Sequence, residues 1–140
     1  MNGILLDTNV LSDQARSRPG DPISRWFDRQ DRDRLFLSEV TVGEIHKGIA
    51  KLSQSHRRRE IERWLDRVLL VEFAGRILPV DRSVWVRWGQ VCGAALRSGG
   101  PLPAIDALLV ATALEHGLAF ATRDGALRRA GVNLVDPWRD

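Results

Sequence analysis

Short apolar runs alternate along the chain with longer stretches in which apolar residues recur every three or four positions. The runs cover residues 4–6, 35–37, 77–80, 118–122 and 132–135. Most of them lack the apolar–polar alternation of a half-exposed strand, so they predict short strands buried on both faces of a parallel sheet. Strands that alternate with helices indicate βαβ units, and the sequence therefore predicts an α/β fold.

The periodic stretches predict helices between these strands. They lie at residues 9–16, 23–27, 39–53, 56–69, 84–96 and 103–115, and a short basic helix starts at Asp124 and ends before Gly131. Ser38 is a suitable N-cap for the third helix, since its side chain can accept a bond from a free backbone N–H. Pro79 predicts an edge or irregular position for the third strand.

Length and composition indicate one globular domain over residues 1–140. The chain is 44% hydrophobic and 28% charged, and its apolar runs are much shorter than a membrane span requires. Asp7 interrupts the first apolar run, so that run does not resemble a secretory signal. Cys92 is the only cysteine, which excludes an internal disulfide and leads us to expect a cytoplasmic protein.

The basic residues are almost all arginines. The net charge is +3 with 21 basic residues, of which only Lys47 and Lys51 are lysines. Arginine matches phosphate geometry, so this balance is compatible with a nucleic-acid partner, although a charge of +3 is modest. The run of residues 57–59 reads either as a solvated helix face or as a surface for RNA or a protein partner.

Four acidic residues follow strands or loops that should meet at one edge of the sheet. Asp7 ends the first strand, Glu44 lies two turns into the helix after the second, Asp106 is in the first turn of the helix after the Gly/Pro loop, and Asp124 follows the fourth strand. Ligands of open α/β sheets bind at this edge. Each acid also has a structural reading, as a helix cap or a surface charge.

The chain resembles PIN-domain ribonucleases of the group that includes the VapC toxins of bacterial toxin–antitoxin pairs. The matching segments are ILLDTNVLS (residues 4–12), LSEVTVGEI (37–45), FAGRILPVD (73–81), PAIDALLVATA (103–113), ATRD (121–124) and DPW (136–138). The middle and final segments are particularly similar to the FitB branch. The resemblance implies a three-layer α/β/α sandwich with a mostly parallel sheet of about five strands.

The resemblance also implies the site. Asp7, Glu44, Asp106 and Asp124 take the acidic catalytic positions, and Thr8, Asn9 and Thr122 support them. Carboxylates gathered in this way repel one another and suit a hard cation such as Mg²⁺ or Mn²⁺. We expect Asp7, Asp106 and Asp124 to be metal ligands, directly or through water, and Glu44 to be a ligand or to orient the attacking water. Gly43 and Ile105 depart from the usual family residues but remove no ligand.

Other residues have less specific interpretations. Arg123, Arg128 and Arg129 lie near the last acid, where they would guide RNA phosphates or form ordinary surface charge. The three histidines have no metal-binding spacing, and the chain lacks the Gly-rich Lys-Ser/Thr motif of a P-loop.

Two functions follow from the resemblance. The first is a metal-dependent endoribonuclease toxin, neutralised by a small DNA-binding antitoxin that carries it to operator DNA. The alternative is a weakly catalytic or non-catalytic PIN-fold subunit of a DNA-binding regulatory complex. In either case we expect a homodimer formed through apolar helical surface that includes Trp64, Trp85 or Trp88.

Overall fold

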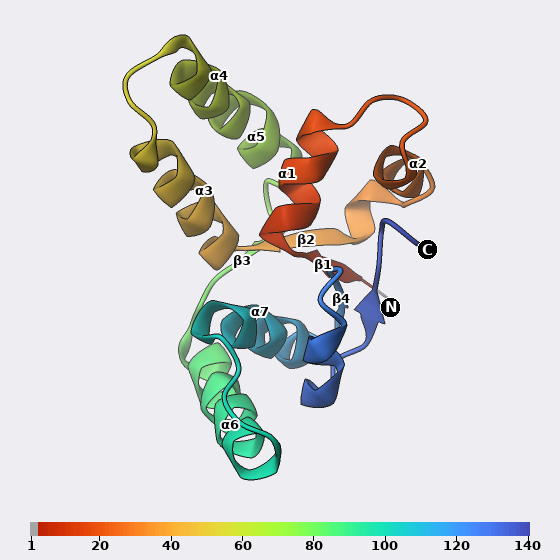
Figure 1. Cartoon of the computed structure of the whole chain (residues 1–140), viewed down its shortest axis with the longest axis vertical. Helices are drawn as coiled ribbons and strands as arrows, with labels where there is room; N and C mark the ends of the chain where they lie inside the picture. Colours follow the sequence, from red (N-terminus) through yellow and green to blue (C-terminus); the bar gives the residue numbers. More distant parts are fainter. Residues whose placement is uncertain (1–2) are drawn as a thin grey trace.

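A computed structural model describes residues 3–140 and contains a five-stranded sheet in which all neighbouring strands are parallel (Figure 1). The strand order is β3-β2-β1-β4-β5. The strands are β1 (Ile4–Leu6), β2 (Leu35–Ser38), β3 (Ile77–Leu78), β4 (Ala119–Ala121) and β5 (Leu134–Val135). The first apolar run therefore forms the central strand, and the strand before Pro79 lies at an edge, as the sequence predicted.

Helices cover both faces of the sheet, which gives three layers (Figure 1). One layer holds α1 (Thr8–Arg16), α2 (Pro22–Asp28), α3 (Glu39–Lys51), α4 (His56–Trp64) and α5 (Leu70–Glu72), together with the short turns η1 (Arg32–Arg34) and η2 (Leu65–Leu69). The other holds α6 (Arg82–Ser98) and α7 (Ala104–Glu115), with η3 (Gly125–Ala130) following β4. The α/β/α sandwich is confirmed. No helix in the described part of the chain is long and apolar enough to cross a membrane.

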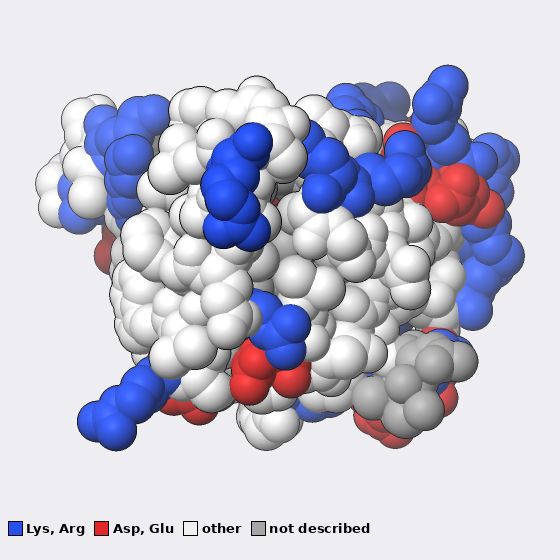
Figure 2. All heavy atoms as spheres, turned by 90° about the horizontal axis from the view of Figure 1, so that it is seen from below, with Lys and Arg blue, Asp and Glu red and all other residues white. Residues whose placement is uncertain are grey.

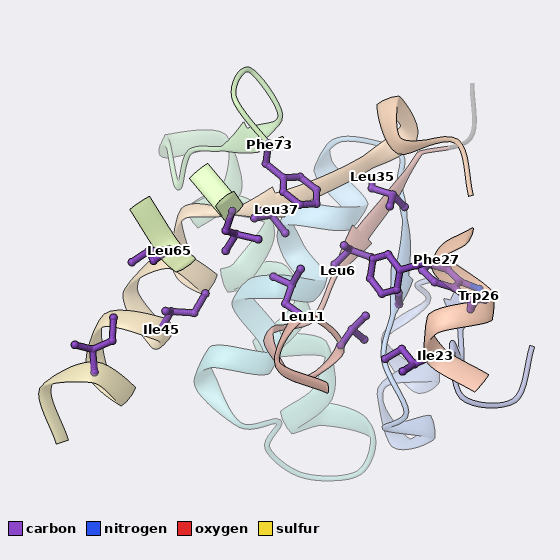
Figure 3. Close-up of a cluster of buried hydrophobic side chains, with 14 residues drawn as sticks. Leu6, Leu11, Ile23, Trp26, Phe27, Leu35, Leu37, Ile45, Leu65 and Phe73 are labelled. Carbon is purple, nitrogen blue, oxygen red and sulfur yellow. The ribbon is translucent and has the colours of Figure 1, made fainter. Parts of the chain in front are cut away.

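Successive residues of each strand belong to two separate cores. Leu6 packs in the core under α1, α2 and the α4–α5 segment, which Figure 3 shows, whereas Leu5 packs against α7 on the opposite face. In β4, Ala121 likewise packs in the same core as Leu6, and Phe120 packs in the same core as Leu5. Since successive side chains of a strand point to opposite faces, a sheet covered on both sides needs apolar residues at every position. This is why the strands read as unbroken apolar runs.

Local signals fix where the helices begin and end. The Ser38 hydroxyl accepts a hydrogen bond from the Val40 N–H at 3.0 Å and starts α3 as predicted. Gly117 follows the end of α7 with a φ of 65°, in the left-handed region that glycine adopts without strain. The Ser38 cap places the first turn of α3 at the carboxyl edge of the sheet, and Gly117 ends α7 where the chain turns into β4.

One predicted apolar face is only partly buried. The 3.6-residue period placed Val68 on the inner face with Leu65 and Leu69, but Val68 is 51% exposed. The cause is η2, which is a π-helical turn over Leu65–Leu69. A π turn inserts an extra residue into the helical period, so one position of the apolar pattern rotates outward. The prediction for Val68 was wrong for this reason.

The predicted apolar stripe of α6 is also only partly buried. Val84, Val91 and Ala95 are buried, whereas Trp85 is 48% and Leu96 65% exposed. The outer side of α6 therefore carries large apolar side chains that the rest of residues 3–140 leaves uncovered. Seen from the α6 side, the middle of the molecule's surface is largely uncharged and the charged side chains lie mainly around it (Figure 2).

Candidate active site

The sheet changes direction between β1 and β4. The chain passes from β1 outward to β2 and β3 on one side, then returns through α6 and α7 to β4 on the other side of β1. At such a switch point the loops after the two strands separate and leave a crevice at their carboxyl ends, where α/β proteins bind ligands. Asp7 follows β1 at this point, and its N–H donates to the Ala121 carbonyl of β4 at 3.0 Å.

Asp7 is a partly buried carboxylate at the start of α1. Burial raises its pKa, and the charge of Asp124 adds to this effect. The Thr122 hydroxyl, which lies 2.8 Å from Asp7 Oδ2, and the backbone N–H groups of Thr8 and Asn9 lower the pKa in part. The balance is a carboxylate whose pKa lies above its ordinary value. A cation beside Asp7 would favour its charged form.

Glu44 is attached to the same region through Thr8. The Thr8 hydroxyl donates to Glu44 Oε1 at 2.5 Å, and it lies 3.1 Å from the hydroxyl of Thr41. Thr41 is fully buried one turn before Glu44 on α3. Because Thr8 directly follows Asp7, this bond brings the carboxylate of Glu44, two turns into a helix after β2, beside the end of β1.

Asp106 lies among the other three acids. It is half-buried in the first turn of α7, and burial is the largest cause that raises its pKa. The charges of Asp7, Asp124 and Glu44 raise it further. The charges of the three other acids, which come from three different segments, therefore all reach Asp106 at this edge of the sheet.

Asp124 begins η3. Its backbone N–H donates to the Thr122 hydroxyl at 3.2 Å, while its carboxylate accepts a bond from the Ala126 N–H at 3.1 Å. Thr122 is 3% exposed, and its single hydroxyl thus touches both acid-bearing segments, at Asp7 and at Asp124. The Thr122 hydroxyl is thus hydrogen-bonded to two of the acidic residues expected at the site.

The donor set fits a hard divalent cation, although the side chains are not gathered around one point. Asp7, Glu44 and Asp124 each accept a bond from a neutral donor nearby. Within residues 3–140, no three Asp, Glu, His or Cys side chains converge closely enough to hold a metal ion as they stand. Carboxylates that repel one another turn to such donors, and their oxygens are the ligands that Mg²⁺ and Mn²⁺ prefer.

Asp81 shows what a purely structural acid looks like at the same edge. It follows β3 and caps α6, accepting bonds from the Val84 N–H at 3.1 Å and the Ser83 hydroxyl at 2.8 Å. The bond from the Val84 N–H is the largest cause that lowers the pKa of Asp81, and the bond from Ser83 lowers it further. The pKa of Asp81, a helix cap, is lowered, whereas the pKa of Asp7, which lies in the acidic cluster, is raised.

The other predicted residues differ in their surroundings. Asn9 is exposed and acts on Asp7 through its backbone N–H. Arg129 is bonded to the carbonyls of Gly100 and Pro101 at 2.9 and 3.3 Å, so it ties η3 to the α6–α7 loop. Arg128 is exposed, and Arg123 stacks on Trp138.

Sequence reasoning missed three residues around the cluster: Thr41, Asp13 and Trp138. Thr41 carried a usable signal, because a threonine one turn before both Glu44 and Ile45 must bring a hydroxyl into a buried helix face, where it needs a partner. Asp13 accepts a bond from Trp138 Nε1 at 3.2 Å. That contact joins residues 125 positions apart, and nothing local in the sequence indicates it.

The five-stranded parallel sheet, its strand order and the acidic residues at the switch point define the class of protein, a three-layer α/β sandwich with acids at its carboxyl edge. The model of the PIN domain family matches residues 4–133, and the chain belongs to this family. It is 37% identical to Toxin FitB of Neisseria gonorrhoeae, over 98% of this chain and 99% of that protein. It is 34% identical to VapC ribonuclease Y4jK of Sinorhizobium fredii, over 96% of this chain and 97% of that protein.

Solved structures agree with these sequence relationships. The structure of FitAB bound to an IR36 DNA fragment matches with a TM-score of 0.91 and 35% identity, covering 98% of this chain and 96% of the other. The VapBC-1 structure from nontypeable Haemophilus influenzae matches with a TM-score of 0.75 at 20% identity, covering 98% of each chain. At 20% identity, the match to VapBC-1 shows only that the two proteins share a fold.

Proposed function

We propose that this chain is a metal-dependent endoribonuclease and the toxin of a toxin–antitoxin pair of the VapBC type. The observation that carries the proposal is the acidic cluster at the β1–β4 switch point, in which the charges of Asp7, Glu44 and Asp124 all act on Asp106. A binding module has no use for four carboxylates at one edge of the sheet, since the repulsion between nearby carboxylates costs stability. The similarity to VapC ribonuclease Y4jK supports the same activity.

Asp7, Asp106 and Asp124 would hold Mg²⁺ or Mn²⁺. When bound, the ion supplies activation of water and stabilisation of the charge that develops on the phosphate during hydrolysis. The fit rests on carboxylates whose charges raise the pKa of Asp106 and, from Asp124, the pKa of Asp7, because a divalent charge offsets that repulsion. Thr122 would keep Asp7 and Asp124 at a fixed spacing through its two hydrogen bonds.

Glu44 has a different role in this proposal. Its Oε1 is bonded to Thr8, so the carboxylate is held in one orientation while it remains partly exposed. A carboxylate fixed in this way is suited to orient the attacking water and to take its proton. The phosphodiester would then be cleaved by a water held between Glu44 and the metal ligands.

The proposed partners follow from the relatives. FitAB is described as a complex bound to DNA, and we propose that this chain likewise binds a small DNA-binding antitoxin and reaches operator DNA only through it. We also propose a homodimer and a cytoplasmic location, in keeping with the single cysteine and an RNA substrate.

The test is cleavage of a panel of structured RNAs by the purified protein with Mg²⁺ or Mn²⁺. We expect cleavage by the wild type and its loss in Asp7→Asn and Asp106→Asn. Asp66→Asn, which changes an exposed acid on η2, serves as the matched control and should cleave normally. An intact RNA panel after incubation with metal-loaded wild type would refute the nuclease activity.

A second candidate function is a weakly catalytic or non-catalytic subunit of a DNA-binding regulatory complex. The observation that favours it is the similarity to FitAB bound to DNA, at 35% identity and a TM-score of 0.91. The same RNA panel separates the two candidates when it is combined with an operator-binding assay of the toxin–antitoxin complex. Operator binding together with an uncut panel would support this second function.

A further inference from the structure

Arg123 occupies a special place in the loop after β4. It lies between Thr122, which is bonded to Asp7, and Asp124. Its guanidinium carbon is 3.8 Å from the centre of the Trp138 ring, which is stacking distance. The Arg123 side chain is nevertheless 59% exposed. The cation is thus held on one face by an aromatic ring and open to solvent elsewhere, directly beside the acidic cluster.

Asp13 on α1 completes this arrangement. Its Oδ2 accepts a bond from Trp138 Nε1 at 3.2 Å and lies 3.9 Å from Arg123 Nη2. Its Oδ1 accepts a bond from Arg16 at 2.8 Å. The carboxylate of Asp13 is therefore bonded mainly to Trp138 and Arg16, and its contact with Arg123 is long.

The Arg123 guanidinium is therefore held in a fixed orientation, while no close carboxylate among the residues that the structure describes neutralises its charge. At 3.9 Å the ion pair with Asp13 is at the limit of a salt bridge, so most of the five N–H donors of the guanidinium are left to other partners. The stack on Trp138 removes much of the conformational freedom that a surface arginine would lose on binding a ligand. Arg129 differs, because backbone carbonyls already take up its donors.

We propose that Arg123 binds a phosphate of the RNA next to the one that is cleaved, and that Trp138 and Asp13 are the positioning residues that hold its guanidinium for this contact. The inference rests on the proposed function, because it assigns a contact to the same substrate. A planar fork with free donors matches two phosphate oxygens. No other basic residue of the η3 segment combines a fixed plane with open donors: Arg128 lacks the stack and Arg129 is already bonded.

The experiment measures RNA binding at several salt concentrations in EDTA, where the chain cannot cleave. For single strands the slope of log affinity against log salt is about 0.7 per phosphate contact. Arg123→Ala should lower affinity about tenfold and reduce the slope by about 0.7. Arg25→Ala, which removes an exposed charge on α2, is the control and should leave the slope unchanged.

The positioning residues give a different pattern. Trp138→Ala and Asp13→Asn keep the Arg123 charge, so each should weaken binding while the salt slope stays nearly constant. Arg123→Lys should behave similarly, because it keeps the charge but loses the planar fork. In the Arg123→Ala background, Trp138→Ala should have no further effect on affinity.

Three results would overturn the inference. An unchanged slope in Arg123→Ala would mean that Arg123 contacts no phosphate, and additive losses in the double variant would mean that Trp138 does not act through Arg123. A loss of thermal stability in Trp138→Ala with unchanged RNA affinity would make the stack purely structural. If the wild type binds no RNA at all, the proposed function fails together with the inference, whereas the other results leave that function intact.

Discussion

The hydroxyl of Thr122 donates to Asp7 Oδ2 at 2.8 Å, across 115 positions of sequence. The hydroxyl oxygen of Thr122 also accepts a hydrogen bond from the Asp124 N–H at 3.2 Å. One buried side chain therefore links the first acid of the cluster to the segment that carries the last. Removing the hydroxyl leaves a partly buried carboxylate and a backbone N–H without their partner.

Thr122→Val tests this link, since valine keeps the shape of threonine without the hydroxyl. We expect the pKa of Asp7 to rise further, because the Thr122 bond is one of the interactions that lower it. Affinity for Mn²⁺ should fall about tenfold, as is typical when a hydrogen bond behind a metal ligand is lost. Calorimetric titration with Mn²⁺ measures this change.

Two variants serve as controls for Thr122→Val. Thr122→Ser keeps the hydroxyl and should retain wild-type metal affinity. Thr112→Val removes another buried hydroxyl, which is bonded only to the Leu108 carbonyl within α7, and should also leave metal affinity unchanged. Equal losses in Thr112→Val and Thr122→Val would show that the effect is one of general packing.

The raised pKa of Asp7 predicts how metal-free stability depends on pH. Below about pH 3.9 the carboxyl is protonated in both the folded and unfolded chain, so the wild type and Asp7→Asn should be equally stable. As pH rises through the folded pKa, the unfolded wild type gives up its proton more readily than the folded form, and the wild type loses stability. Near neutral pH, Asp7→Asn should be the more stable by about 1–3 kcal/mol.

Urea unfolding of both proteins in EDTA between pH 3 and pH 8 measures this difference. Added Mn²⁺ should reverse it, because the metal stabilises only the chain that keeps its ligand. If Asp7→Asn is the less stable at neutral pH without metal, Asp7 is a structural cap in the manner of Asp81, and its place among the metal ligands is wrong.

Glu44→Gln should separate catalysis from binding. Glutamine keeps an oxygen that accepts the Thr8 hydroxyl bond, so the fold should remain. The amide cannot take a proton from water, and kcat should fall about 10²- to 10⁴-fold with little change in KM. The exposed Glu39 in the first turn of α3 gives the control Glu39→Gln, which should cleave RNA normally. Normal kcat in Glu44→Gln would exclude Glu44 as the base.

The largely uncharged surface on the α6 side predicts where two copies associate (Figure 2). Trp85, Val86 and Leu96 are large apolar side chains exposed there, and covering them removes apolar area from water. Leu96→Glu should convert a homodimer to a monomer in light scattering. Val71→Glu is a closely matched control, since Val71 is also 65% exposed but lies on the other layer. If Val71→Glu dissociates the dimer and Leu96→Glu does not, the interface lies on the other layer.

The sheet could be predicted from sequence because most strands are apolar runs without polar alternation, as a sheet covered on both faces requires. The acids could be placed because parallel strands bring their carboxyl ends to one edge. Asp106 followed from the loop before α7, whose helix returns toward that edge. In each of these cases the decisive information lies within a few neighbouring residues.

What could not be predicted depends on contacts between distant segments or on a local change of helical period. The π turn that exposes Val68 does not show in the apolar spacing. The Asp13–Trp138 bond joins α1 to the last residues described, and Trp85 and Leu96 belong to an apolar stripe that one chain covers only in part. The buried Thr41 could have been recognised, because a hydroxyl on an inward helix face requires a partner.

The bond between Thr122 and Asp7 also has a consequence for the time at which the protein acquires its site. The central strand β1 is synthesised before its neighbour β4 and the Asp124 segment. A nascent chain that stops before Thr122 holds Asp7, Glu44 and Asp106 but has neither the hydroxyl that links Asp7 to the Asp124 segment nor Asp124 itself. The complete acidic cluster therefore arises only after Asp124 has been synthesised, through contacts between residues far apart in the sequence.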